Sequence, residues 1–250
     1  MYRKTYLKVD VDNFIKNSDI YVKHTGKKMM GIVKADAYGV GDYPMAQYLE
    51  KHGVDFFGVS SLEESLRLRK HGIKSEILIL SYIHDIDTCK KNNLSVIVPN
   101  RMFIDEHKNN LEGLKVHIKI NTGLNRLGIK PSELNDVIKD LTNYKADIEG
   151  VMTHFACSES EEITNKHFAL FKEAVINSGF KFNYIHTSAT DAAIYLKDDI
   201  SNYIRIGLGL LGSSDFGDKF PLYNVPSLYA EIIDCKQIPA GEGVSYQHNQ

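Results

Sequence analysis

Short apolar runs alternate with amphipathic stretches along most of the chain. The runs are rich in β-branched and aromatic residues and occupy residues 29–33, 56–60, 76–80, 95–98, 116–120, 148–153, 184–186 and 203–206. Between them, apolar positions recur at helical spacing, as in residues 44–52 and 62–71, and a glycine follows each of these two stretches. Glycine is favoured just after a helix because it adopts the left-handed conformation without steric penalty. The pattern therefore predicts eight strand–helix units.

Eight such units favour parallel strands joined by crossover helices and closed into a (β/α)8 TIM-type barrel. An open doubly wound sheet is the alternative, because it is built from the same units. A further strand at residues 7–11 with a helix at 12–24 precedes the barrel, and a strand-like run at 228–233 follows it. Residues 212–226 are rich in Gly, Pro, Asp and Ser and predict a long loop. We assign the barrel domain to residues 1–238.

Composition narrows the class of partner. The 250 residues are 43% hydrophobic and 25% charged, as in an ordinary globular protein with a full core. Thirty Lys and Arg nearly balance 32 Asp and Glu, so no overall field favours nucleic acid or a membrane, and a small molecule is the expected partner.

The cysteines and the start of the chain bear on the compartment. Cys89, Cys157 and Cys235 are odd in number and far apart, which argues against a disulfide framework and for a reducing environment. Residues 1–10 are charged and lack the apolar stretch of a secretory signal, and no run is long enough to cross a bilayer. We expect a cytoplasmic protein.

Reactive side chains follow several of the predicted strands, at the end where barrel enzymes carry their sites. Lys34 follows the first strand, and a desolvated lysine there is suited to form a Schiff base with a carbonyl group. The alternative is a lysine whose amine simply reaches solvent. The other candidates at this end of the barrel are Lys119, Arg126, His154, Thr190, Arg205 and Gly207.

Two further patterns have weaker functional interpretations. Residues 207–212, Gly-Leu-Gly-Leu-Leu-Gly, fit a dinucleotide-binding fingerprint, but the polar residues after them do not favour the helix that this site requires. Their backbone N–H groups, with the hydroxyl of Thr190, instead suit a phosphate group. His154, Cys157 and His186 do not supply the four ligands of a zinc centre, so we predict no metal there.

Four segments carry sequence motifs. Residues 33–39 read Val-Lys-Ala-Asp-Ala-Tyr-Gly, and residues 119–128 read Lys-Ile-Asn-Thr-Gly-Leu-Asn-Arg-Leu-Gly. Residues 153–156 read Thr-His-Phe-Ala, and residues 205–207 read Arg-Ile-Gly. In this order and spacing they resemble the motifs of the alanine racemase family, fold-type III pyridoxal-phosphate enzymes. Residues 240–246 resemble the segment that introduces the C-terminal β domain of that family.

The resemblance implies roles for individual residues. Lys34 would bind pyridoxal 5′-phosphate covalently and move the α-proton on one face of the substrate. The phosphate would be bound by Tyr38, Thr190, Gly207 and Leu208, and the pyridine ring would contact His154 and Arg205. Arg126 would lie on the substrate side, positioned by Lys119, which is carbamylated in many relatives. An arginine at the ring nitrogen leaves that nitrogen unprotonated, which favours racemisation over transamination.

The resemblance also implies an isomerase that interconverts L- and D-alanine for peptidoglycan precursors and works as a homodimer when full-length. The second base of the family is a tyrosine of the C-terminal domain, and no residue of this chain matches its motif. We therefore expect an N-terminal cofactor-binding domain that is inactive or weakly active alone, with residues 239–250 beginning the connection to a further domain.

Other interpretations stay open at this point. Asn121 stands where the family usually has aspartate, and Ala189 with Thr190 replaces a frequent Asn-Ser pair, so serine or another amino acid is a possible substrate. A single-domain pyridoxal-phosphate-binding protein without turnover is one alternative function. A metal-dependent barrel hydrolase using His154, His186 and Asp191 is another, although the predicted strands place these residues at separate ends.

Overall fold

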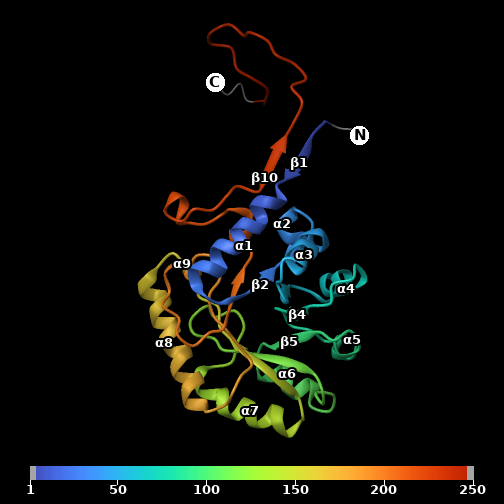
Figure 1. Cartoon of the computed structure of the whole chain (residues 1–250), viewed down its shortest axis with the longest axis vertical. Helices are drawn as coiled ribbons and strands as arrows, with labels where there is room; N and C mark the ends of the chain where they lie inside the picture. The colour runs from blue at the N-terminus through green and yellow to red at the C-terminus, as the bar shows by residue number, and fades with distance from the viewer. Residues whose placement is uncertain (1–3, 247–250) are drawn as a thin grey trace.

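The computed structural model describes residues 4–246 and contains a closed barrel of eight parallel strands in sequence order (Figure 1). The strands are β2 (Lys28–Ile32), β3 (Phe56–Val59), β4 (Glu76–Ile79), β5 (Ser95–Val98), β6 (Lys115–Lys119), β7 (Asp147–Met152), β8 (Tyr184–His186) and β9 (Tyr203–Ile206). β9 pairs with β2, with Arg205 opposite Met30, and this pairing closes the barrel. All eight predicted strands are confirmed, and the open sheet is excluded.

Helices cover the outside of the barrel. They are α1 (Val11–Thr25), α2 (Lys34–Gly39), α3 (Asp42–Lys51), α4 (Leu62–Lys70), α5 (Ile86–Lys91), α6 (Arg101–His107), α7 (Leu134–Asn143), α8 (Glu161–Ser178) and α9 (Ala192–Tyr195). Gly53 and Gly72, which follow α3 and α4, have φ values of 95° and 87°, as the sequence predicts. Within residues 4–246, none of the helices combines the length and apolar character needed to cross a membrane.

Two layers of side chains form the core. One lies between the strands and the helices, and it includes Leu49, Leu68 and Val137. The other fills the barrel interior and includes Met30, Phe56 and Leu78. Because successive residues of a strand face opposite sides, each strand contributes to both layers. A few polar side chains also occupy the interior, and they belong to the site described below.

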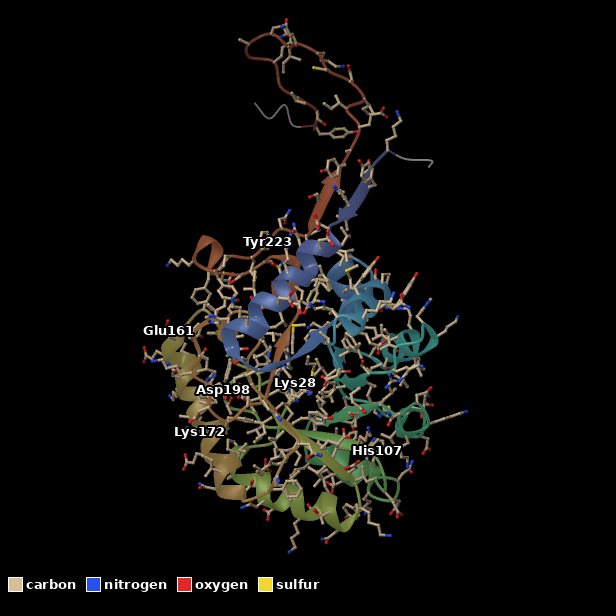
Figure 2. All side chains as sticks on the ribbon, in the orientation of Figure 1. Lys28, His107, Glu161, Lys172, Asp198 and Tyr223 are labelled. Carbon is tan, nitrogen blue, oxygen red and sulfur yellow. The ribbon has the colours of Figure 1, made fainter. Side chains whose placement is uncertain are left out.

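A two-stranded sheet joins the two ends of the chain outside the barrel. β1 (Tyr6–Val9) pairs antiparallel with β10 (Pro226–Tyr229), with Tyr6 opposite Tyr229. The predicted strand at residues 228–233 is therefore wrong in extent, because β1 offers partners only to residues 226–229. Beyond it, Ile232 and Ile233 are 83% and 94% exposed, and the segment projects away from the barrel (Figures 1 and 2).

The segment after β9 differs in detail from the predicted loop. A short 3-10 turn, Leu208–Leu211, follows Gly207, and a second one, Gly217–Lys219, lies inside residues 212–226. Neither turn is the α-helix that a dinucleotide-binding fingerprint requires, as the sequence indicates.

Candidate functional site

Basic side chains converge at the carboxyl end of the barrel. Burial, followed by the charges of Arg126, Arg205 and Lys34, lowers the pKa of Lys119 to about 8. The groups that act on Lys119 are therefore all cationic. An anionic ligand would offset this repulsion, so the site fits a group that carries a phosphate and a substrate that carries a carboxylate.

Lys34 is presented by an unusual turn directly after β2. Residues 35–38 have φ values of 51°, 55°, 49° and 58°, a left-handed conformation that L-residues other than glycine adopt rarely. Three hydrogen bonds hold the turn: Ala37 N donates to Val33 O at 3.0 Å, Ala35 N to Glu64 Oε1 at 2.7 Å and Gly41 N to Asp36 O at 2.8 Å. The turn brings Lys34 Nζ to 6.0 Å from the centre of the Tyr38 ring.

The residues predicted to bind phosphate lie together. A Cβ atom at Gly207 would lie 2.2 Å from the Tyr38 hydroxyl, so the close approach of these two residues requires glycine. Burial raises the pKa of Tyr38 to about 12, which keeps its hydroxyl a hydrogen-bond donor. Gly209 N donates to Thr190 Oγ1 at 3.1 Å, next to the exposed Leu208. The hydroxyls of Tyr38 and Thr190 thus lie beside the turn that contains Gly207 and Gly209, and together they form one cradle.

Arg205 occupies the centre of the site and is only 3% exposed. It donates to the carbonyl oxygens of Thr153, His186 and Thr187 at 2.7–2.8 Å. Burial lowers its pKa to about 9, so the guanidinium stays charged at neutral pH. Arg205 is therefore a buried charge and not a surface one, and the carbonyl oxygens fix its orientation.

His154 is held beside Arg205 in its neutral form. Arg205 Nη2 lies 3.2 Å from His154 Nδ1, and a guanidinium carries only donors, so Nδ1 is the unprotonated nitrogen and Nε2 carries the proton. Burial first, and then the positive charge of Arg205, lowers the pKa of His154 to about 3. A neutral ring is suited to pack against another aromatic ring.

Two further histidines, whose role was not predicted from the sequence, extend this network into the barrel. His186 Nδ1 lies 3.0 Å from Arg205 Nη1, so His186 Nε2 carries a proton and donates to His117 Nδ1 at 2.8 Å. His117 Nε2 then carries the proton and lies 3.9 Å from Glu149 Oε2. The sequence does contain a sign that His117 faces the barrel interior. His117 precedes Lys119 by two residues in β6, and residues two apart in a strand lie on the same face.

The hydrolase alternative does not fit this geometry. His154 and His186 do not lie at separate ends, as the sequence analysis expected, because both rings contact Arg205. A metal cation held between the two rings would be repelled by the positive charge of the Arg205 guanidinium. Asp191 instead accepts from Ser214 Oγ at 2.6 Å and from Asp215 N at 3.2 Å.

Arg126 is carried by the loop after β6, which Asn121 shapes. Asn121 Oδ1 accepts from Gly123 N at 3.2 Å and from Asn125 N at 3.0 Å, while Asn121 Nδ2 donates to Asn125 Oδ1 at 3.0 Å. The last bond needs an amide, which an aspartate would not supply. Asn121 therefore acts on the loop, and Arg126 itself is exposed.

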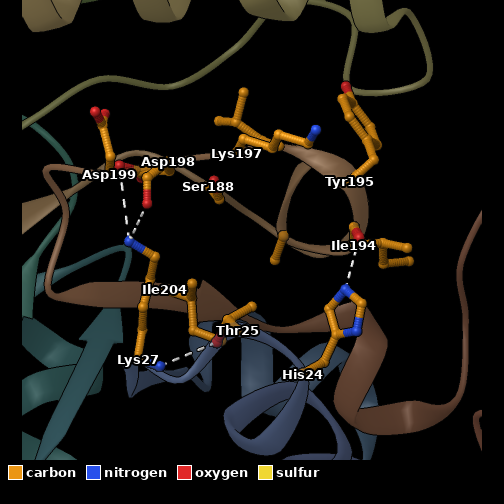
Figure 3. A pocket seen from close by; sticks show the side chains of 12 residues that line it. His24, Thr25, Lys27, Ser188, Ile194, Tyr195, Lys197, Asp198, Asp199 and Ile204 are labelled. Carbon is orange, nitrogen blue, oxygen red and sulfur yellow. Dashed lines mark hydrogen bonds and ion pairs between the residues drawn. The ribbon is translucent and has the colours of Figure 1, made fainter.

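A cavity of about 390 Å³ lies beside α1 and α9, behind the strand end that holds Arg205 (Figure 3). Lys27, which lines the cavity, donates from Nζ to the carbonyl oxygens of Asp198 and Ser201, at 2.7 and 2.6 Å. Asp198 Oδ2 accepts from Thr187 Oγ1 at 2.7 Å. These polar groups are paired within the protein, so they support Thr187, whose carbonyl oxygen accepts from Arg205.

The chain is similar to known proteins in sequence and in fold. The family model described as "Alanine racemase, N-terminal domain" matches residues 9–215. The chain is 33% identical to an alanine racemase of Staphylococcus saprophyticus over 261 residues, which cover 98% of the chain and 68% of that protein. Among solved structures, the alanine racemase of E. faecalis has a TM-score of 0.91 at 27% identity, covering 100% of the chain and 72% of its own. A histidine racemase of Leuconostoc mesenteroides has a TM-score of 0.85 at 22% identity, covering 100% and 71%, and shares the fold.

Proposed function

Because the chain belongs to the family of the alanine racemase N-terminal domain, we propose that it is the cofactor-binding barrel of a pyridoxal-phosphate-dependent amino-acid racemase, an isomerase. The observation that carries this proposal is the convergence of Lys34, Lys119 and Arg205 on one end of the barrel, beside a cradle formed by Tyr38 and Gly207. The positive charge suits an anionic cofactor and an amino-acid carboxylate.

Pyridoxal 5′-phosphate, when bound, supplies the electron-withdrawing ring that stabilises negative charge at the substrate α-carbon. Lys34 would hold it through Nζ until the amine of the substrate takes its place, and the freed Nζ would then accept or return the α-proton. Tyr38, Thr190, Gly207 and Leu208 would bind the phosphate.

Arg205 and His154 would bind the ring of the cofactor. Arg205 is fixed by three carbonyl oxygens, so its guanidinium is held ready to donate to the ring nitrogen. A guanidinium gives up its proton reluctantly, so the ring nitrogen stays unprotonated, which favours racemisation over transamination. His154, neutral and oriented by Arg205, would pack against the ring.

Lys119 and Arg126 would act on the substrate side of the site. With a pKa of about 8, part of the Lys119 amine is neutral at pH 7 and is available to react with carbon dioxide. We propose carbamylation at Lys119, which would replace a positive charge beside Arg126 and Arg205 with a negative one.

Alanine is the proposed substrate, with serine as an alternative, and the proposed role is the supply of D-alanine for peptidoglycan. We place the protein in the cytoplasm, since Cys89, Cys157 and Cys235 are all unpaired. We also propose a homodimer for the full-length enzyme.

The domain boundary is part of the same proposal. We assign residues 1–238 to the barrel domain and residues 239–250 to the start of a connection to a further domain. Residues 1–3 and 247–250 lie outside the described part of the chain. The exposed apolar side chains of Ile233 and Val244 support this assignment, because they suit burial against another domain.

Reduction with borohydride tests the cofactor site. Purified protein mixed with pyridoxal 5′-phosphate is reduced, digested and analysed by mass spectrometry. We expect the modification on Lys34, because this lysine directly follows β2 and is the one to which the resemblance assigns the covalent bond with the cofactor. Lys34→Ala should lose the label, and Lys51→Ala, an exposed lysine of α3, should keep it. Modification of a different lysine in the wild type would contradict the assignment.

A further inference from the structure

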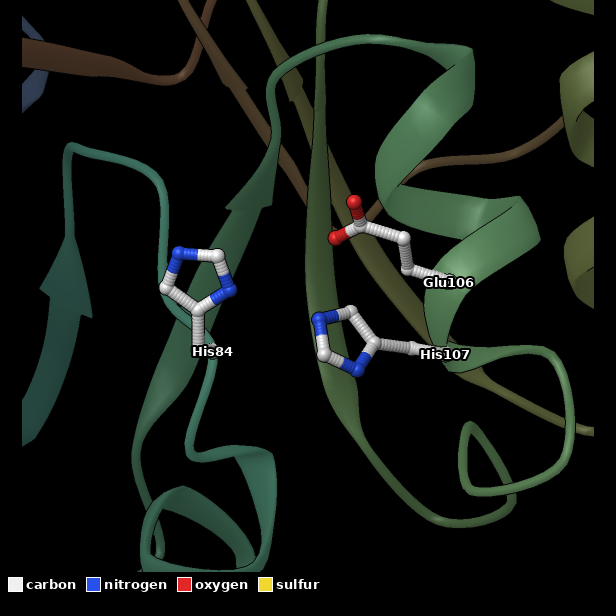
Figure 4. Close-up of side chains that lie close together, drawn as sticks. All are labelled: His84, Glu106 and His107. Carbon is white, nitrogen blue, oxygen red and sulfur yellow. The ribbon is translucent and has the colours of Figure 1, made fainter.

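We propose that the chain carries a second site, for a divalent transition-metal cation, formed by His84, Glu106 and His107. His84 precedes α5, and the other two residues end α6. One potential ligand atom from each side chain lies within 4.8 Å of the others. In Figure 4 the two imidazole rings face one another, with the carboxylate beside them. This proposal is independent of the cofactor chemistry at the carboxyl end of the barrel.

His107 provides a second observation that points to a ligand. Its Nε2 atom is buried and has no hydrogen-bond partner among residues 4–246. A buried polar atom left without a partner is unfavourable, because it has lost its hydrogen bonds to water. Coordination of a cation would satisfy this nitrogen, since neutral imidazole is a common metal ligand.

Tyr82 and Phe103 fix the proposed ligands. The Tyr82 hydroxyl donates to Glu106 Oε2, which holds the carboxylate in place. The ring of Tyr82 lies 4.9 Å from that of His84, and the ring of Phe103 lies 4.8 Å from that of His107. Such outer contacts orient the ligands of metal sites in proteins.

The ligand types select the cation. Two imidazoles and one carboxylate are a set that zinc accepts, with a fourth position open to water, whereas calcium and magnesium prefer all-oxygen sites. A cation here would link the segment before α5 to the end of α6. Zinc is therefore the probe of choice, and cobalt(II) is a spectroscopic substitute.

Calorimetric titration of untagged, chelator-treated protein with zinc tests the site. We expect one cation per chain, and at least a tenfold loss of affinity in His84→Ala and in Glu106→Gln. Tyr82→Phe should weaken binding by roughly 10- to 100-fold, as is typical when an outer-shell partner is lost. Cobalt(II) should give the visible absorption of a four-coordinate site in the wild type and not in His84→Ala or Glu106→Gln.

Two controls make the test decisive. His71→Ala removes an exposed histidine on α4's C-terminal end and should leave zinc binding unchanged. Lys34→Ala should also bind zinc normally, which separates this site from the cofactor site. His84 is exposed, so its variant is expected to fold, and circular dichroism checks this. Absence of stoichiometric binding, or binding that persists in both His84→Ala and His107→Gln, would overturn the proposal.

Discussion

Lys119 ends strand β6 with 4% of its surface exposed and with Arg126, Arg205 and Lys34 as positive neighbours. In the unfolded chain the amine has its ordinary pKa of 10.5, and in the folded protein the pKa is about 8. Between these two values the unfolded chain binds more protons than the folded one, so the stability of the protein rises with pH across this interval. Below about pH 8 the full cost of the buried charge is present.

Lys119→Met is therefore expected to raise the free energy of unfolding at pH 7 by on the order of 1–3 kcal/mol in the cofactor-free protein. The advantage should shrink as the pH rises above 8 and be absent near pH 10.5. Urea unfolding in buffers free of carbon dioxide measures this difference. Lys130→Met, at an exposed position, serves as the control at each pH. An advantage that does not change with pH would contradict a buried charge as its cause.

For single residues, the sequence motifs predict which side chains belong to the site. They do not predict which atoms those side chains contact. Lys34, His154 and Arg205 were predicted as site residues, and the structure brings them together. The role of His186 was not predicted, because it depends on a guanidinium that the neighbouring strand β9 supplies. Such contacts between strands are set by the closure of the barrel, which no local pattern contains.

The left-handed turn at residues 35–38 is an element that its own sequence does not favour. Alanine and tyrosine in this conformation are unfavourable by about 1–2 kcal/mol per residue. The turn persists because Glu64 of α4 accepts from Ala35 N and because its backbone bonds to Val33 and Gly41 are made. Strain of this kind collects at functional sites, and here it positions Lys34 and Tyr38.

Ala35→Gly should keep or raise the free energy of unfolding, by up to about 1 kcal/mol, because glycine adopts this conformation freely. Ala169→Gly, at an exposed position inside α8, should lower it by about 1 kcal/mol, because glycine is unfavourable in a helix. Thermal or urea unfolding of the two variants gives the comparison. Equal destabilisation by both substitutions would show that residue 35 is not strained.

Elements with continuous buried runs were the most predictable. Each end of the eight barrel strands was predicted to within one residue, because both faces of such strands are buried and largely apolar. The end of β10 was misplaced, because its length is set by its partner β1 and not by its own composition. The turn of α2 was missed, since contacts with α4 and the barrel impose it.

For the whole molecule, the proposed reaction needs acid–base groups on both faces of the substrate. We propose that Lys34 serves one face, and the resemblance to the family assigns the other to a tyrosine that no residue of this chain matches. The relatives contain additional sequence, since the chain spans 68% of the length of the Staphylococcus saprophyticus protein.

The 250-residue chain, loaded with cofactor, is therefore expected to exchange the α-proton of one alanine enantiomer for deuterium and to retain its configuration. Racemisation should be slower by about 100- to 10,000-fold than exchange, the usual loss for one positioned acid or base. Mass spectrometry after chiral chromatography of separate L- and D-alanine incubations measures both. Racemisation as fast as exchange would require a second base within the chain.

The pairing of β1 with β10 also has a consequence for synthesis of the protein on the ribosome. Tyr6 cannot meet Tyr229 until more than 200 further residues have been made. At roughly 5–20 residues per second, the first strand waits on the order of 10–40 s without its partner. During that time its apolar side chains, such as Leu7, are accessible to other nascent chains and to chaperones. The segment that closes the fold last is thus the one that leaves the ribosome first.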